Sequence, residues 1–105
     1  MSETYPKGTI QELFDDNPKT WTQGSYGRDY NGDPAGPQGG FATSWCILGA
    51  ASKVYPGFND HKRQEILVRL KRYAVVHGFG SISGWNDAPN RTFEEVKALV
   101  KELNI

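Results

Sequence analysis

The stretch "GWNDAPNRTFEEV", residues 84–96, decides how the last part of this chain folds. Thr92 can cap a helix with its side-chain oxygen, and Glu95 follows at the three-residue spacing of a capping box. Glu94 and Glu95 also lie in the first turn, where the helix dipole favours acidic side chains. Apolar residues then recur at helical spacing at Phe93, Val96, Leu99, Val100 and Leu103. The stretch therefore predicts an amphipathic helix that begins just after Thr92.

The residues ahead of this helix fit a structural clip better than a chemical site. Asn86 and Asp87 are residue types whose side chains fold back on the backbone in Asx turns, and Pro89 fixes its own φ. Trp85 can anchor the segment in the core, which leaves only Arg91 without a structural role. We therefore expect a turn-rich clip, with a ligand-binding or catalytic site as the alternative.

Further helices are expected on the N-terminal side of this stretch. Residues 42–55 predict a helix capped by Thr43 or Ser44. Gly49 inside it costs about 1 kcal/mol relative to alanine, so another element is expected to approach closely there. Residues 9–14 predict a short helix with a capping box of its own.

The longest helix is expected over residues 59–78, with Asn59 or Asp60 as its cap and Gly78 as a left-handed terminator. Its apolar side chains fall on one arc of the helix, and basic side chains cover much of the rest. A solvated helix face is the default interpretation of such a basic surface, and a contact surface is the alternative.

Residues 24–40 are rich in glycine and proline and predict a long irregular loop. Within residues 21–33, the pair Asn31-Gly32 suits a type I′ turn, so a short β-hairpin is one alternative. An irregular loop held by aromatic side chains is the other.

Together these patterns predict one mainly α domain over residues 1–105, a bundle of three to four helices with a loose arm at residues 1–8. The predicted core consists of Trp45, Leu48, Leu67, Leu70, Trp85, Val96, Leu99 and Val100.

Charge and composition argue against several functional classes. The 12 basic and 12 acidic residues cancel, whereas nucleic-acid binders usually carry a basic excess. No apolar run approaches a membrane span, and the N-terminus lacks the pattern of a signal peptide. One cysteine and two histidines without ligand spacing predict no metal site. A cytoplasmic protein without a cofactor is expected.

The long loop and the basic helix are the candidate binding surfaces. Long loops in small domains are often functional, and Tyr and Arg are the residue types that anchor interfaces. The candidate contact residues are Tyr26, Arg28, Tyr30, Asp33, Arg69 and Arg72.

Cys46 is the one candidate nucleophile. In the first turn of its predicted helix, the dipole would lower the pKa of the thiol. His77, on the apolar arc of the longest helix, would be its base, and Asp87 or Asn86 would orient that base. A buried cysteine acting as a small apolar residue is the favoured alternative.

The motifs "WTQGSYGRDYNG", "TSWCILGA" and "ISGWNDAPNRTFEEV" resemble a family of small uncharacterised proteins, found mostly in actinobacteria and their phages. The shared frame is W-x-x-G at Trp21–Gly24, W-C-x-x-G-A at Trp45–Ala50, and W-N-D at Trp85–Asp87 followed by Arg91, Thr92 and Val96. The resemblance covers about residues 20–103. It implies a bacterial or phage origin and an intracellular setting, with no established activity.

The expected function is that of a small protein-binding module without catalytic activity, a phage or mobile-element accessory protein that binds a host protein. Its contact surface would combine the long loop with the basic helix face. The alternative is a cysteine-dependent hydrolase or transferase that uses Cys46.

Overall fold

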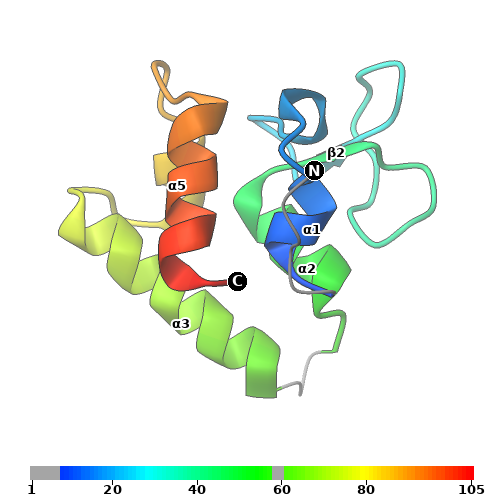
Figure 1. Cartoon of the computed structure of the whole chain (residues 1–105). Coiled ribbons are helices and arrows are strands. Elements are labelled where there is room, and N and C mark those ends of the chain that lie inside the picture. The colour runs from blue at the N-terminus through cyan, green and yellow to red at the C-terminus, as the bar shows by residue number, and fades with distance from the viewer. Residues whose placement is uncertain (1–7, 58–60) are drawn as a thin grey trace, which may run out of the picture.

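Five α-helices and one two-stranded ribbon form the regular structure of residues 8–57 and 61–105, which the computed structural model describes (Figure 1). The elements are, in chain order, the helix α1 (Ile10–Phe14), the 3-10 helix η1 (Pro18–Thr20), the strands β1 (Gly27–Arg28) and β2 (Ser44–Trp45), and the helices α2 (Ile47–Val54), α3 (His61–Val76), α4 (Ile82–Asn86) and α5 (Phe93–Leu103). The predicted mainly α fold is confirmed. The predicted arm, apart from Gly8, and the predicted caps Asn59 and Asp60 lie outside the described residues.

α2 is the central helix of the fold, since it packs against α1, α3 and α4. α1 packs against α2 and α5, while α3 packs against α2 and α4. α3 runs along the edge of the molecule opposite the long loop (Figure 1). Gly78 ends α3 in the left-handed conformation, as predicted, and its N–H donates to the carbonyl of Val75 at 3.0 Å.

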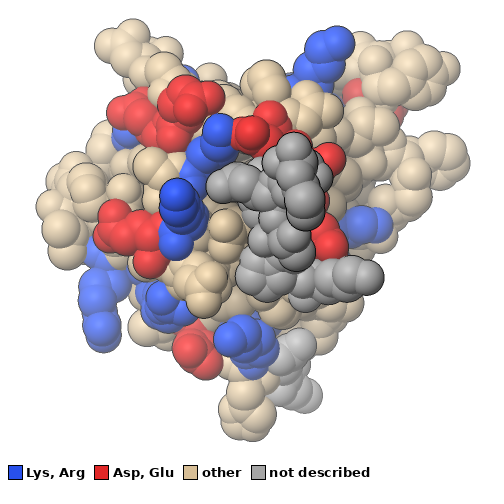
Figure 2. Space-filling model, in the orientation of Figure 1, with Lys and Arg blue, Asp and Glu red and all other residues tan. Residues whose placement is uncertain are grey.

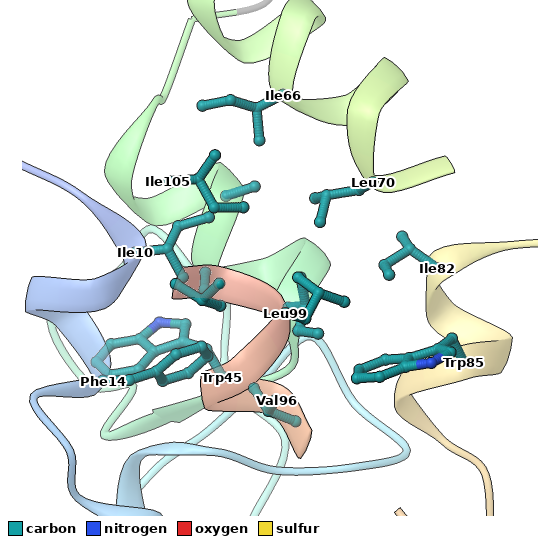
Figure 3. Close-up of a cluster of buried hydrophobic side chains, with 14 of the residues drawn as sticks. Ile10, Phe14, Trp45, Ile66, Leu70, Ile82, Trp85, Val96, Leu99 and Ile105 are labelled. Atoms are coloured by element: carbon teal, nitrogen blue, oxygen red, sulfur yellow. The ribbon is translucent and has the colours of Figure 1, made fainter. Parts of the chain in front are cut away.

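The core lies between all five α-helices and includes Trp45 and Trp85 (Figure 3). Ile10, Ile66, Leu70 and Leu99 are fully buried, and each such side chain contributes about 1.5–3 kcal/mol relative to an exposed one. The predicted core is confirmed, except that two of its leucines are only partly buried at the edge. These two are Leu48 and Leu67.

The prediction missed Ile105, which is 1% exposed and packs within this core. Asn104 takes the left-handed conformation at the end of α5 and turns the chain back. The N–H of Ile105 then donates to the carbonyl of Val100, and its carbonyl accepts from the N–H of Gln11 at 3.1 Å. An isolated apolar residue after a helix carries no periodic signal, so the sequence pattern could not assign it.

The predicted start of α2 is wrong by about three residues. Ser44 and Trp45 are extended because they pair with β1, Ser44 opposite Arg28 and Trp45 opposite Gly27. The indole of Trp45 also donates to the carbonyl of Pro37 at 2.9 Å. The pairing uses backbone groups that a helix would need, so Cys46 becomes the N-cap instead of Thr43 or Ser44.

The predicted type I′ turn is also wrong, although a turn forms at the predicted place. The N–H of Gly32 donates to the carbonyl of Asp29, and the N–H of Asp29 donates to the carbonyl of Asp33. Gly32 has a φ of 87°, whereas Asn31 does not take a positive φ, which a type I′ turn requires. The hydrogen bonds fit a three-residue loop that ends in a left-handed glycine. The residues that leave the loop return alongside β1, where Pro34 forms an antiparallel bridge with Arg28. The other edge of β1 pairs with β2 rather than with residues 21–26.

Gly49 lies where another element approaches, as predicted. A Cβ atom there would overlap the carbonyl oxygen of Tyr26 and lie 2.8 Å from its carbonyl carbon. Only a glycine on α2 therefore lets the chain entering β1 lie directly on the helix.

Candidate functional site

Asn86 joins three segments that are far apart in the sequence. Its carboxamide is fully buried, and Oδ1 accepts from the indole Nε1 of Trp21 at 2.8 Å and from the N–H of Ile47 at 3.1 Å. Nδ2 donates to the carbonyl of Thr22 at 3.1 Å and to Oδ1 of Asp87 at 2.9 Å. Two donors face one end of the amide and two acceptors face the other, so the orientation of the amide is determined by its partners.

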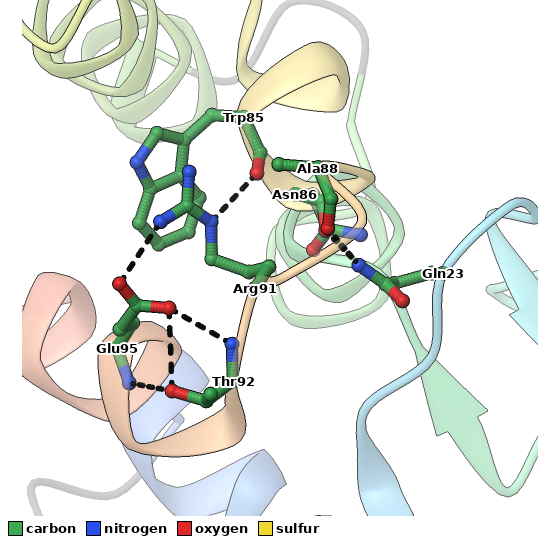
Figure 4. A network of polar contacts seen from close by, with 7 residues as sticks. All are labelled: Gln23, Trp85, Asn86, Ala88, Arg91, Thr92 and Glu95. Atoms are coloured by element: carbon green, nitrogen blue, oxygen red, sulfur yellow. Dashed lines mark hydrogen bonds and ion pairs between the residues drawn. The ribbon is translucent and has the colours of Figure 1, made fainter.

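Residues 21–24 lie directly on the turn after α4. The side-chain Nε2 of Gln23 donates to the carbonyls of Asn86 and Ala88, at 2.9 Å each (Figure 4). The N–H of Gly24 donates to Oδ1 of Asp87 at 3.0 Å. We call this set of contacts between residues 21–24 and 86–88 the asparagine joint.

Arg91 has a structural role as well. Its guanidinium carbon lies 3.7 Å from the ring centroid of Trp85, and its Nε donates to the Trp85 carbonyl at 2.8 Å (Figure 4). Its NH1 pairs with Glu95 at 3.2 Å. The predicted capping box of Thr92 and Glu95 is confirmed, and the N–H of Thr92 holds the pKa of the Glu95 carboxyl below its usual range, with help from Arg91.

The predicted Asx turn at Asn86 is wrong, since this residue ends the helix α4 and its side chain reaches across to other segments. Local spacing could not reveal this role, because the partners lie 39 and 65 residues away. All three tryptophan motifs nevertheless meet here: Trp21 contributes its indole, Ile47 its N–H and Asp87 its carboxylate. The residues of these motifs therefore have a structural role: they connect three distant segments of the chain.

An open cavity of about 480 Å³ lies beside the asparagine joint. It is bordered by the first residues of the long loop, the start of α2 and the α4 segment. The residues that line it are Gly24, Ser25, Tyr26, Pro34, Cys46, Ser83 and Asp87. Of these, Ser25 and Ser83 were not singled out by the sequence, because isolated serines carry no positional signal.

The structure brings two of the three candidate catalytic residues together. Cys46 and Asp87 line the same cavity, but His77 does not. The imidazole of His77 stacks on Tyr73 with ring centroids 4.1 Å apart, and its Nδ1 lies 2.8 Å from the Tyr73 carbonyl oxygen. His77 is exposed there, in the turn directly after α3.

The thiol of Cys46 has a raised pKa. Burial is the main cause, and the negative charge of Asp87 adds to it, while the N–H of Gly49, which donates to Sγ at 3.2 Å, acts in the opposite direction. The expected lowering by the helix dipole is therefore wrong for this thiol, because loss of hydration outweighs the backbone N–H groups.

We expect Cys46 to resist alkylation in the folded protein. Because the pKa is raised, the thiol should stay neutral at pH 7–8, and iodoacetamide should react with it at least tenfold more slowly than in denaturant. Quantifying the remaining thiol by mass spectrometry over time, with and without urea, measures this ratio. Equal rates would show that the thiolate forms readily in the native state.

The candidate contact residues on the loop divide into two kinds. Tyr26 and Tyr30 are exposed, at 58% and 85%. Arg28 is instead held inside the loop, where its guanidinium donates to the Thr22 hydroxyl and to the carbonyls of Gln23 and Gly32 at 2.9–3.0 Å. Asp33 is exposed.

The sequence interpretation missed Phe41, an aromatic residue that is 83% exposed. An aromatic residue directly after Gly39-Gly40 in a loop without apolar periodicity was an available signal. Phe41 is therefore a third exposed aromatic side chain, at the C-terminal end of the loop.

α3, which carries the other two candidate contact residues, lies on the opposite side of the molecule from the loop (Figure 1). Arg69 donates to the carbonyl of Leu103 at 2.6 Å and so supports the end of α5. Arg72 is exposed. Figure 2 shows basic and acidic side chains interspersed on the face in view, without a wide area of one sign.

The described residues contain no group of three or more His, Cys, Asp or Glu side chains that could hold a metal ion. None of their helices has both the length and the apolarity that crossing a bilayer requires.

The fold and the asparagine joint define a small, mainly helical domain held together by a buried amide. The chain belongs to a family of unknown function, DUF6197, which matches residues 17–103. No curated protein and no solved structure matches the chain. A family of unknown function fits the resemblance seen in the sequence, and the matched residues 17–103 cover nearly the same range as that resemblance.

Proposed function

We propose that the protein is a binding module without catalytic activity and that residues 24–41, here called the aromatic loop, contact a partner protein. The observation that carries the proposal is the exposure of Tyr26, Tyr30 and Phe41, at 58%, 85% and 83%. Large aromatic side chains dominate interface energetics, and small domains seldom leave several of them in water on one loop.

The hydrogen bonds of the loop support this proposal. The N–H of Ala35 donates to the Gly27 carbonyl at 2.9 Å, and the side chain of Gln38 reaches Ser52 on α2. With the guanidinium of Arg28 inside, these contacts hold the loop in one shape. A loop ordered before binding loses less conformational entropy when it meets a partner.

α3 is not part of the proposed surface, because the helix lies on the other side of the molecule from the loop (Figure 1). A bacterial or phage origin and a cytoplasmic setting, which the sequence resemblance implies, belong to the same proposal. A host protein is then the natural partner.

The test compares variants in affinity capture from bacterial lysate. Y30S together with F41S should reduce the recovery of any captured partner at least tenfold, since both aromatic anchors are lost. The matched control is V68S with V75S, which removes two apolar residues that are 57% and 55% exposed on α3. Capture that survives the loop variant, or that fails equally with the control, would refute the proposal.

A cysteine-dependent enzyme is the second candidate, because Cys46 and Asp87 share one cavity. Such an enzyme would need a base for the thiol, and neither described histidine, His61 or His77, lines that cavity. The raised pKa of the thiol also disfavours the thiolate. The binding module is therefore the better supported function.

A further inference from the structure

The cavity beside the asparagine joint is lined by one carboxylate among mostly uncharged residues. Asp87 is the one charged residue among those that line it, and the others are two serines, an aromatic residue, a thiol and two residues without polar side-chain atoms. Tyr26 belongs both to this lining and to the aromatic loop. The cavity is thus continuous with the proposed contact surface.

The carboxylate of Asp87 is fixed in position but is not neutralised. Its Oδ1 accepts from the N–H of Gly24 and from Nδ2 of Asn86. Both donors are uncharged, and Asp87 forms no ion pair with a residue of the described segments. The side chain therefore presents a negative charge to the cavity at an orientation set by the fold.

The start of α2 does not turn this cavity into an anion site. The N–H of Ile47 donates to Oδ1 of Asn86, and the N–H of Gly49 donates to Sγ of Cys46. These donors are therefore already used within the protein. A carboxylate with hydroxyls and an aromatic residue nearby instead favours a planar cation with several N–H donors.

We propose that the cavity binds the guanidinium of an arginine side chain on the partner protein. This inference rests on the proposed function, since it adds one specific subsite to the aromatic loop. Asp87 would accept from the guanidinium, Ser25 and Ser83 would offer hydroxyl oxygens at other sides, and Tyr26 would offer an aromatic face. Such a subsite would select partner proteins that present an arginine next to the apolar residues contacted by the aromatic loop.

The test needs no partner protein. The ¹⁵N-labelled protein is titrated at low salt with N-acetyl-arginine N-methylamide and, separately, with the matching citrulline derivative, which has the same shape and no charge. The arginine probe should cause saturable shifts at Gly24, Cys46, Ser83 and Asp87, and the citrulline probe should cause none. Binding should weaken at least severalfold from 20 to 500 mM salt, because the charge pair is open to solvent.

The key variant is D87N, which keeps an acceptor oxygen for the N–H of Gly24 and removes the charge. It should bind the arginine probe at least tenfold more weakly. E65Q is the matched control, since Glu65 is an exposed acid on α3 outside the cavity lining and outside the proposed contact surface, and it should bind as the unmodified protein does. Equal binding of citrulline, or full affinity in D87N, would overturn the inference.

The salt dependence keeps the inference falsifiable if D87N disturbs the loop, because arginine binding that ignores salt would also overturn it. Tighter binding of agmatine than of the capped arginine would overturn the assignment to a protein partner. The two proposals can fail separately. If the arginine probe does not bind but the capture of a partner still depends on Tyr30 and Phe41, only the subsite is refuted. If the arginine probe binds saturably but the loop variant captures its partner as before, only the loop interface is refuted.

Discussion

Asn86→Ala is expected to destabilise the domain by about 3–5 kcal/mol. The substitution leaves the indole N–H of Trp21, the N–H of Ile47 and the carbonyl of Thr22 without their partner, and each unsatisfied buried group costs about 1–3 kcal/mol. Because small domains have about 5–15 kcal/mol of stability in total, much of it would be lost. Urea denaturation followed by circular dichroism measures the change, and the melting temperature should fall by roughly 15–30 °C.

Asn90→Ala is the matched control, because Asn90 lies four residues further along and is exposed. Surface substitutions of this kind usually change stability by about 0.5 kcal/mol or less. If both alanine variants melted together, the buried amide would not be what holds the three segments in place.

Gly49→Ala is expected to destabilise by about 3 kcal/mol or more, against the intrinsic preference of the helix. Alanine in the middle of a helix is favoured over glycine by about 1 kcal/mol, so an unhindered site would become more stable. Here the new Cβ would overlap the carbonyl oxygen of Tyr26, and β1 would have to move away from α2. The sign of the change in unfolding free energy therefore reports directly on the close approach.

Gly80→Ala serves as the control, since a Cβ there meets no atom within 4 Å and its φ is not positive. It should leave stability nearly unchanged or raise it slightly. A stabilised Gly49→Ala variant would mean that the aromatic loop does not rest on α2 in solution.

Elements with a strong local signal were predictable from the sequence. Thr92 and Glu95 stand at capping-box spacing, and Gly78 terminates α3, so both helix ends could be assigned from neighbouring residues alone. A close approach of another segment at Gly49 could be predicted, because a glycine inside a helix is unfavourable unless it makes room for a neighbour. The neighbour itself, Tyr26, could not be identified from the sequence.

The errors concern residues whose conformation depends on distant partners. Ser44 and Trp45 have helix-compatible neighbours, yet they are extended because β1 pairs with them. Asn86 has the composition of a turn, yet its amide satisfies groups from two other segments. At the candidate site, Cys46 and Asp87 line one cavity, whereas His77 stacks on Tyr73 and does not line it, and no local spacing in the sequence carries this arrangement.

The asparagine joint also has a consequence for folding kinetics. Its hydrogen bonds connect residues 63–65 positions apart, so the joint closes most of the chain into one loop. Closing such a loop is entropically unfavourable until the helices on either side have formed, which places the joint late on the folding path. Changes at Asn86 should then accelerate unfolding far more than they slow refolding, so the joint would determine how long each folded molecule persists.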